Sequence, residues 1–165
     1  CSLLTVKEIG DMYKEGKTAE EMVEWAKTAV SKVGCYFFAD DLKFFKHSGR
    51  VSGIAGTMGT LLGIRPIIYM NEEGKLVSVG KEKGRVKAIE RIVSYVDQLG
   101  EDVKDHRVLV GHADCRDIAE DVEKMLKEKY GDDLNTMIVD VNPTAGSHCG
   151  PNTVGVCFHA NRRSL

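Results

Sequence analysis

Two stretches near the amino terminus have the apolar spacing of amphipathic helices. Apolar side chains recur at intervals of three and four in residues 6–13 and again in residues 22–30. Each stretch comes with a threonine followed three positions later by glutamate, as in a capping box: Thr5 with Glu8, and Thr18 with Glu21. We therefore expect a pair of short helices to open the chain.

From residue 35 onward, short apolar runs alternate with longer amphipathic stretches. The apolar runs predict strands at 35–39, 64–70, 76–79, 107–111, 136–141 and 154–159, and the amphipathic stretches predict helices at 86–99 and 114–131. Asp114 has the position of a cap for the second of these helices. Such alternation predicts an α/β fold whose mixed, partly parallel sheet is flanked by helices, with ligands bound at the carboxyl ends of strands.

The composition is that of a globular domain, and the charges almost balance. The 165 residues are 42% hydrophobic and 29% charged, with a formal net charge of −2. Because no basic excess is available to neutralise a phosphate backbone, we expect no nucleic-acid partner. No apolar run approaches the roughly 18 residues of a transmembrane helix, so we expect no membrane span.

The five cysteines do not form a disulfide pattern. Their number is odd and no CxxC pair occurs: Cys1, Cys35, Cys115, Cys149 and Cys157. In a chain of this length, that pattern favours free thiols in a reducing compartment. We therefore expect a cytoplasmic protein.

The charged segment 40–52 contains an arginine that could bind an anion. Arg50 follows a helix-ending Gly49 and precedes an apolar segment, so its guanidinium could lie at the mouth of an apolar pocket. Arginine suits that place because its planar fork binds a carboxylate or phosphate bidentately and stays charged when partly buried. The alternative is a short surface helix whose charges are simply solvated.

The following segment, 53–63, combines apolar residues with glycines spaced GxxGxxG. This spacing differs from the dinucleotide-binding GxGxxG, and no strand leads tightly into it. Each glycine costs a helix roughly 1 kcal/mol relative to alanine, so some packing gain should offset the cost. Close approach of a neighbouring helix would provide it, and so would a long apolar ligand beside the small-residue face.

The segment 142–153 lies between two predicted strands and is rich in turn-forming residues. We expect a loop, which is where binding residues concentrate. Ser147 and His148 offer hydrogen-bond donors, and Gly146 and Gly150 let the backbone approach a ligand. The alternative for His148 is a structural histidine with its partners satisfied.

Catalytic and metal sites are weakly supported by the sequence. Cys149 is next to His148, but adjacent residues in an extended loop point apart and would not form a dyad. His112, Asp114 and Cys115 could be imagined around zinc with that pair, yet none of the spacings matches a zinc motif. We therefore expect no catalytic residue, no metal and no cofactor.

Four segments resemble, in order, the motifs of the DegV family of fatty-acid-binding proteins. Residues 37–52, FFADDLKFFKHSGRVS, resemble F-V-x-D-x-L-x-x-L-x-x-G-G-R-I-S; residues 62–68 resemble L-x-I-K-P-I-L; residues 81–88 resemble K-x-R-G-R-x-K-A; and residues 146–153 resemble G-x-H-x-G-P-G-x. Three positions depart from the pattern. Ser48 replaces a glycine, Arg65 replaces lysine, and Asn152 replaces the last glycine.

The resemblance implies a two-domain protein that binds a long-chain fatty acid between its domains. Residues 1–34 would be connecting helices from an N-terminal domain absent from this chain, and residues 35–165 the C-terminal lipid-binding domain. A Thr and a Ser of the absent domain would hold part of the carboxylate. The family presents bound fatty acid to a separate kinase, which phosphorylates the carboxylate to an acyl phosphate for lipid synthesis.

The resemblance also assigns roles to residues of this chain. Arg50 and His148 would complete the hydrogen bonding of the carboxylate, beside Ser147 and Gly150. An acyl chain needs an apolar lining, for which the segment 53–68 offers Ile54, Met58, Leu61, Ile64 and Ile67. Arg85 and Lys83 would belong to the surface that meets the kinase.

Two other functions remain open at this point. A hydrolase or transferase could use Cys149 or His148 as its reactive group. A pure interaction module could use Arg50 and Arg85 as a docking face without any ligand.

Overall fold

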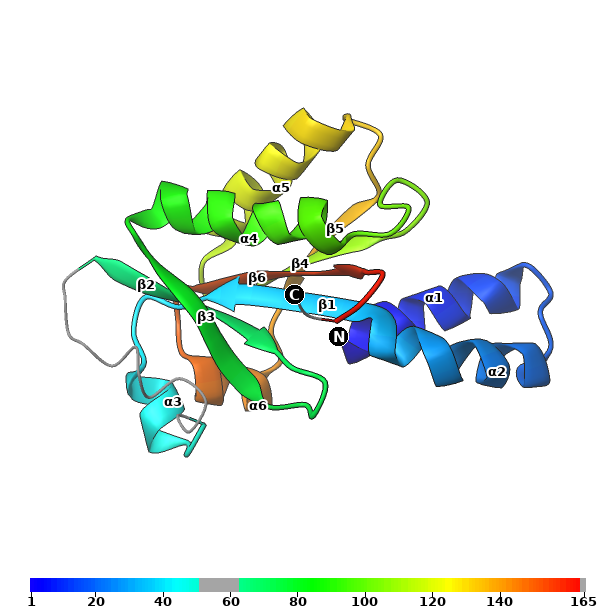
Figure 1. Ribbon diagram of the computed structural model, residues 1–165, viewed down its shortest axis with the longest axis horizontal. Coiled ribbons are helices and arrows are strands. Elements are labelled where there is room, and N and C mark those ends of the chain that lie inside the picture. The colour runs from blue at the N-terminus through cyan, green and yellow to red at the C-terminus, as the bar shows by residue number, and fades with distance from the viewer. Residues whose placement is uncertain (51–62, 164–165) are drawn as a thin grey trace.

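The computed structural model describes residues 1–50 and 63–163 (Figure 1). The elements are α1 (Ser2–Lys14), α2 (Ala19–Ala29), the 3-10 turn η1 (Val30–Lys32), β1 (Val33–Phe38), α3 (Lys43–His47), β2 (Ile64–Met70), β3 (Leu76–Lys83), α4 (Arg85–Leu99), β4 (Val108–Ala113), α5 (Arg116–Tyr130), β5 (Thr136–Asp140), α6 (Pro143–Cys149) and β6 (Thr153–His159). The predicted lining residues Ile54, Met58 and Leu61 lie outside the described residues.

The strands form one six-stranded sheet in the order β3-β2-β1-β6-β4-β5. Only β4 and β5 pair in parallel, while the other neighbours pair antiparallel. The expected α/β fold with a mixed, partly parallel sheet flanked by helices is therefore confirmed.

One face of the sheet is covered by α4 and α5, which lie side by side above it (Figure 1). The apolar sides of α4 and α5 pack on alternate residues of the four inner strands. The edge strands β3 and β5 contribute only partly buried side chains to this contact. The result is one continuous core that includes Tyr36, Ile67, Ile92, Val110 and Phe158. This core contains most of the buried hydrophobic residues that the structure describes.

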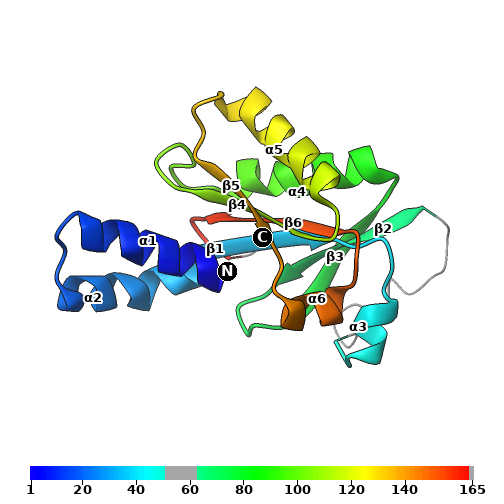
Figure 2. The same cartoon turned by 180° about the vertical axis from the view of Figure 1, so that it is seen from behind.

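The other face carries two small, separate apolar clusters. Ala39, Phe45 and Ile68 form one beneath α3 and α6, at the carboxyl end of β1. Leu4, Val33 and Leu109 form the other, where α1 meets the opposite end of the sheet. Figure 2 shows α3 and α6 together on this face, with α1 and α2 projecting away from the far end.

The two predicted capping boxes have different outcomes. The box at Thr18 is confirmed, because the Thr18 hydroxyl accepts from the Glu21 amide and the Glu21 carboxylate accepts from the Thr18 amide. The box at Thr5 is wrong, since α1 begins at Ser2 and Thr5 lies inside it. Glu8 instead points into the protein, where its carboxylate lies 3.4 Å from His106.

Two further local predictions are corrected. Cys115, not Asp114, is the N-cap of α5, and Asp114 adopts a left-handed φ of 52°. The expected loop 142–153 contains the helix α6, because Asn142 caps it and Pro143 supplies a preset helical φ at the first position. No helix among the described residues is long and apolar enough to cross a membrane.

Candidate ligand-binding site

Four strand ends meet at one edge of the sheet. The pairing makes β1, β3, β4 and β5 run in the same direction, so their carboxyl ends coincide. The segments that follow these strands contain Arg50, Arg85 and His148, and Lys83 ends β3. The predicted polar site residues therefore gather at the edge where α/β sheets bind their ligands.

His148 is held by α6 with a nitrogen that lacks a partner. The helix is fixed at its start by the Asn142 side chain, which accepts from the Ala145 amide at 3.0 Å. The His148 ring is half-buried, and its Nδ1 is shielded from solvent without a hydrogen-bond partner among the described residues. A buried polar atom without a partner is costly, so this nitrogen is suited to receive a ligand atom.

Ser147 does not share this environment. It lies on the exposed side of α6, and its hydroxyl donates to the Thr144 carbonyl at 2.8 Å. Successive helix residues point about 100° apart. Ser147 would have to exchange this local bond for one to a ligand.

Gly150 brings α6 into contact with α3. It ends α6 with φ of 76°, and a Cβ added there would lie only 2.3 Å from the ring of Phe44 on α3. No side chain could occupy that space. The glycine therefore allows the helix that carries His148 to pack on the helix that leads to Arg50.

Arg50 follows α3 through a glycine-stabilised turn. Gly49 has φ of 72°, and the Arg50 amide donates to the Phe45 carbonyl at 2.8 Å, which is the bond pattern of a Schellman cap. The short helix ended by Gly49, expected as an alternative, is therefore present. The Arg50 side chain is exposed, and its guanidinium donates to the Ser48 carbonyl.

An apolar floor lies under α3 and α6. Ile68 and Phe45 are almost fully buried there, and Phe37 and Cys149 pack against them. Ile67 is not part of this floor, because the strand alternation turns it to the α4 side, where it is fully buried in the main core. Ile64, at the start of β2, is half-buried.

Lys83 and Arg85 flank Gly84 at the beginning of α4, and both are exposed. Arg85 lies 3.4 Å from Asp117 at the start of α5. A surface ion pair of this kind contributes little, so Arg85 can exchange this partner for another carboxylate. The two cations are thus available at the same edge as His148.

Sequence reasoning missed two pairs of residues at this edge. Arg65 donates to Asp40 at 2.6 Å, which ties the segment after β1 to β2. His112 lies 3.4 Å from Asp140 at the ends of β4 and β5. Each pair joins residues at least 25 positions apart, so only the strand order could have revealed them.

The thiols near this edge are poor nucleophiles. Burial raises the pKa of the Cys149 thiol, and burial raises the pKa of Cys115 to about 11. A catalytic cysteine needs the opposite shift, because the thiolate is the reactive form. Among residues 1–50 and 63–163, the imagined zinc ligands around His112 and His148 do not form a group of three that one ion could bridge.

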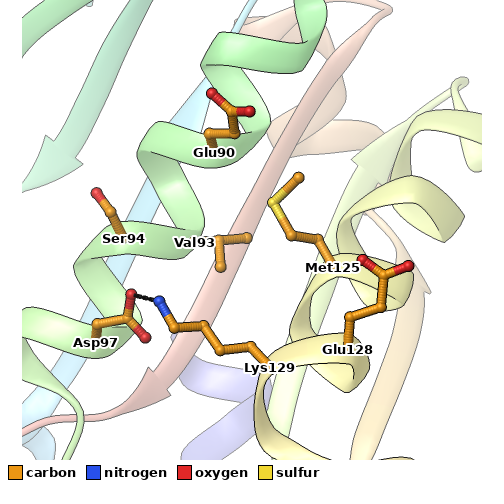
Figure 3. Close-up of a pocket in the computed structure, with 7 residues that line it drawn as sticks. All are labelled: Glu90, Val93, Ser94, Asp97, Met125, Glu128 and Lys129. Atoms are coloured by element: carbon orange, nitrogen blue, oxygen red, sulfur yellow. Dashed lines mark hydrogen bonds and ion pairs between the residues drawn. The ribbon is translucent and has the colours of Figure 1, made fainter.

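A groove of about 340 Å³ lies between α4 and α5, on the opposite side of the sheet from α3 and α6 (Figure 3). Charged side chains dominate its rim, and Lys129 pairs there with Asp97. Its lining includes none of the predicted ligand-binding residues. A charged lining of this kind is unsuited to an acyl chain.

Comparison with known proteins identifies relatives over nearly the whole chain. Residues 3–161 match the family model described as "Uncharacterised protein, DegV family". A DegV domain-containing protein of Clostridium perfringens is 31% identical over 156 residues, which are 94% of this chain and 53% of that protein. The chain therefore spans about half the length of the curated relatives it matches.

Solved structures share the fold. A DegV family protein of Ruminococcus gnavus, refined with vaccenic acid, has a TM-score of 0.84 at 24% identity, with 94% of this chain and 55% of that chain covered. The fatty acid kinase B3 protein of Streptococcus pneumoniae, loaded with linoleic acid, has a TM-score of 0.83 at 18% identity, with 96% and 55% covered. The chain belongs to the DegV family.

Proposed function

We propose that this chain forms part of a fatty-acid-binding site and that the protein presents the fatty-acid carboxylate to a fatty acid kinase. The observation that carries the proposal is His148, whose shielded Nδ1 lacks a hydrogen-bond partner among the described residues, next to Cys149, which packs on the apolar floor. A polar group at the end of an apolar surface is the anatomy that a fatty acid requires.

The carboxylate end of the ligand would lie at α6. A protonated imidazole nitrogen donates a charge-assisted hydrogen bond to a carboxylate, which satisfies both groups in a partly dry environment. Arg50 would reach the same carboxylate by releasing the Ser48 carbonyl. Ser147 and the Gly150 backbone would stand beside it, and a preceding domain would complete the shell.

The acyl chain would extend along the apolar floor formed by Phe37, Phe45 and Ile68. Each methylene removed from water contributes about 0.8 kcal/mol, so a long chain gains most of its affinity from such a surface. Ile64 would extend the lining along β2, with Ile54, Met58 and Leu61 contributed by the segment 51–62. Ile67 would contribute only indirectly, because it faces the main core.

The protein would act as a carrier and leave the phosphoryl chemistry to its partner. The raised pKa of Cys149 argues against the alternative of a thiol hydrolase or transferase, because the thiol stays protonated at neutral pH. The two solved structures compared above contain vaccenic acid and linoleic acid, and one of these proteins is named as a fatty acid kinase B3 protein. The exposed cations Lys83 and Arg85 would meet the kinase.

Replacement of His148 and of the two cations separates ligand binding from kinase docking. The variants would be made in the native polypeptide that contains this chain, with fatty-acid affinity and acyl-phosphate formation as the two readouts. His148→Ala should weaken fatty-acid binding about 10- to 100-fold, the value of one hydrogen bond to a charged group, with little change in melting temperature. Thr144→Ala, at an exposed position of the same helix, is the matched control.

Arg50→Ala should also weaken fatty-acid binding, with Lys46→Ala on α3 as its control.

The double variant Lys83→Glu/Arg85→Glu should reduce acyl-phosphate formation while fatty-acid affinity stays at the wild-type value. Lys104→Glu breaks a comparable surface ion pair at the far end of the domain and should have no effect. Wild-type affinity in His148→Ala, or a large loss of stability in it, would remove this residue from the site.

A further inference from the structure

Three cysteines from distant parts of the sequence meet at the end of the sheet opposite the candidate lipid site. Cys1 precedes α1, Cys35 lies in β1, and Cys157 lies in β6. Cys35 and Cys157 are direct cross-strand partners, with their sulfur atoms 3.3 Å apart. All three sulfur atoms lie within 4.8 Å of one another.

This spacing is close to that of three thiolates around one metal ion. A metal–sulfur bond of about 2.3 Å places the sulfur atoms of a planar three-coordinate site about 4.0 Å apart. The cluster therefore needs only small side-chain rotations to enclose an ion. Among the described residues, no histidine, aspartate or glutamate joins the three cysteines as a fourth potential ligand.

The number and kind of ligands select the metal. Thiolates are soft ligands that favour Cu(I), zinc and iron–sulfur clusters, and zinc in structural sites is almost always four-coordinate. We propose that Cys1, Cys35 and Cys157 form a three-thiolate site for Cu(I), a binding function separate from the fatty-acid site.

The surroundings suit a soft, singly charged ion. Cys1 and Cys157 pack against the small apolar cluster of Leu4, Val33 and Leu109, and Met137 packs against the same cluster. A low-polarity environment of this kind disfavours hydrated, hard cations more than Cu(I) bound to sulfur. Each of the three cysteines is only partly buried.

The protein holds two of the three ligands rigidly. Cys35 and Cys157 lie on adjacent strands in the middle of the sheet, and both strands are paired on their other side as well. The Cys157 thiol donates a hydrogen bond to the Cys35 sulfur, so the two side chains already face each other. Metal binding displaces thiol protons, so affinity should increase with pH.

The site is separate from the proposed fatty-acid site. Both lie on the same face of the sheet, but α3 and α6 cover the carboxyl end of β1, whereas Cys35 lies near its start. Cys115 and Cys149 are the other two thiols of the chain, and neither belongs to the cluster. They supply matched control substitutions.

The test is a competition for Cu(I) between the reduced protein and the chromogenic chelator bicinchoninate, without oxygen and with a phosphine reductant. The wild-type protein should retain one equivalent of Cu(I). Cys1→Ser, Cys35→Ser and Cys157→Ser should each lower the affinity at least about 100-fold, since each removes a direct ligand. Cys115→Ser and Cys149→Ser should bind like the wild type.

Two additional measurements keep the result interpretable. Thermal unfolding of each metal-free variant shows whether a loss of Cu(I) reflects a loss of fold, and X-ray absorption of the copper-loaded protein should show three sulfur neighbours. Wild-type affinity in Cys35→Ser and Cys157→Ser, an equal loss in the two control variants, or displacement of Cu(I) by equimolar Zn²⁺ would overturn the proposal.

Discussion

The two faces of the sheet differ in how their apolar residues are distributed. The face under α4 and α5 has one continuous core, whereas the other face has two small clusters at opposite ends, under α3 with α6 and under α1. A continuous core gives a domain most of its stability, because each side chain removes apolar area from water and also supports its neighbours. The divided face leaves room for other contacts.

Both proposed binding functions lie on the divided face. His148 stands at one end, and the three-cysteine cluster stands at the other. On the continuous face, the charged groove between α4 and α5 includes none of the predicted ligand-binding residues in its lining (Figure 3). We infer that side chains on the continuous face mainly stabilise the fold, whereas side chains on the divided face also bind ligands. Substitutions at adjacent residues that face opposite sides should therefore differ in their effects on stability and on binding.

The largest effect is expected from Ile67 and Ile68, which are adjacent in β2, equally buried and turned to opposite faces. Ile67→Ala should cost about 3–5 kcal/mol of unfolding free energy, because the continuous core cannot collapse into the cavity. Ile68→Ala should cost less, about 2–3 kcal/mol, because α3 can move inward. Denaturant unfolding of both variants measures the difference.

The same pair also separates folding from function. Ile68→Ala should weaken fatty-acid binding at a temperature where both variants remain folded, while Ile67→Ala should not. Equal stability losses combined with equal binding losses would mean that the two faces are not functionally distinct.

A smaller effect is expected where α6 packs on α3. Gly150→Ala combines a left-handed backbone position with a collision against Phe44, whereas Gly74→Ala has nearly the same φ, 75°, and open space around the added Cβ. Gly74→Ala should cost about 1 kcal/mol through the backbone alone. Gly150→Ala should cost about 1–3 kcal/mol more and should weaken fatty-acid binding by displacing His148.

Removal of the Phe44 ring, with which the added Cβ collides, gives the control for Gly150→Ala. In Gly150→Ala/Phe44→Ala, most of the additional cost and the loss of binding should be relieved, as a double-mutant cycle would record. If Gly150→Ala behaves like Gly74→Ala in both assays, the contact between α3 and α6 does not position His148.

The sequence was most informative where a signal is local and least informative where a partner is distant. The box of Thr18 and Glu21 formed because both groups are exposed on one turn and have no competing partner. The same pattern at Thr5 and Glu8 failed because α1 begins at Ser2, which places Thr5 inside the helix. Glu8 lies against His106, nearly a hundred residues later. A local capping preference worth about 1 kcal/mol therefore did not decide where this helix begins.

The candidate site shows the same limit. The alternation of side chains along β2 was predictable from the sequence. Which face of the sheet Ile67 takes depends on how β2 is aligned with its neighbouring strands, because a shift of one residue exchanges the two faces. His148 could be selected by motif resemblance, yet its shielded nitrogen follows from α6, where a loop was expected. The three cysteines carried no signal at all, because their closeness arises only from the pairing of β1 with β6 and the docking of α1.

The smallest effect concerns how α1 attaches to the divided face, where charged groups supplement a single fully buried leucine, Leu4. Burial raises the pKa of Glu8 above its ordinary value even though His106 opposes the shift. One turn later, a hydrogen bond from Arg107 at 3.0 Å lowers the pKa of Asp11. The two carboxyl groups should therefore affect stability with opposite dependence on pH.

The signs follow from proton linkage. A raised pKa means that the folded state binds the Glu8 proton more tightly than the unfolded state, so this stabilisation is present below about pH 4.5 and is lost as pH rises through the raised value. For Asp11, the stabilisation is present above about pH 3.8 and is lost as pH falls through the lowered value. Unfolding free energies from pH 3 to pH 8 should show Glu8→Gln gaining stability relative to the wild type as pH rises, and Asp11→Asn losing it. Parallel curves for the two variants would mean that burial does not dominate at Glu8, and that α1 is attached by ordinary surface ion pairs.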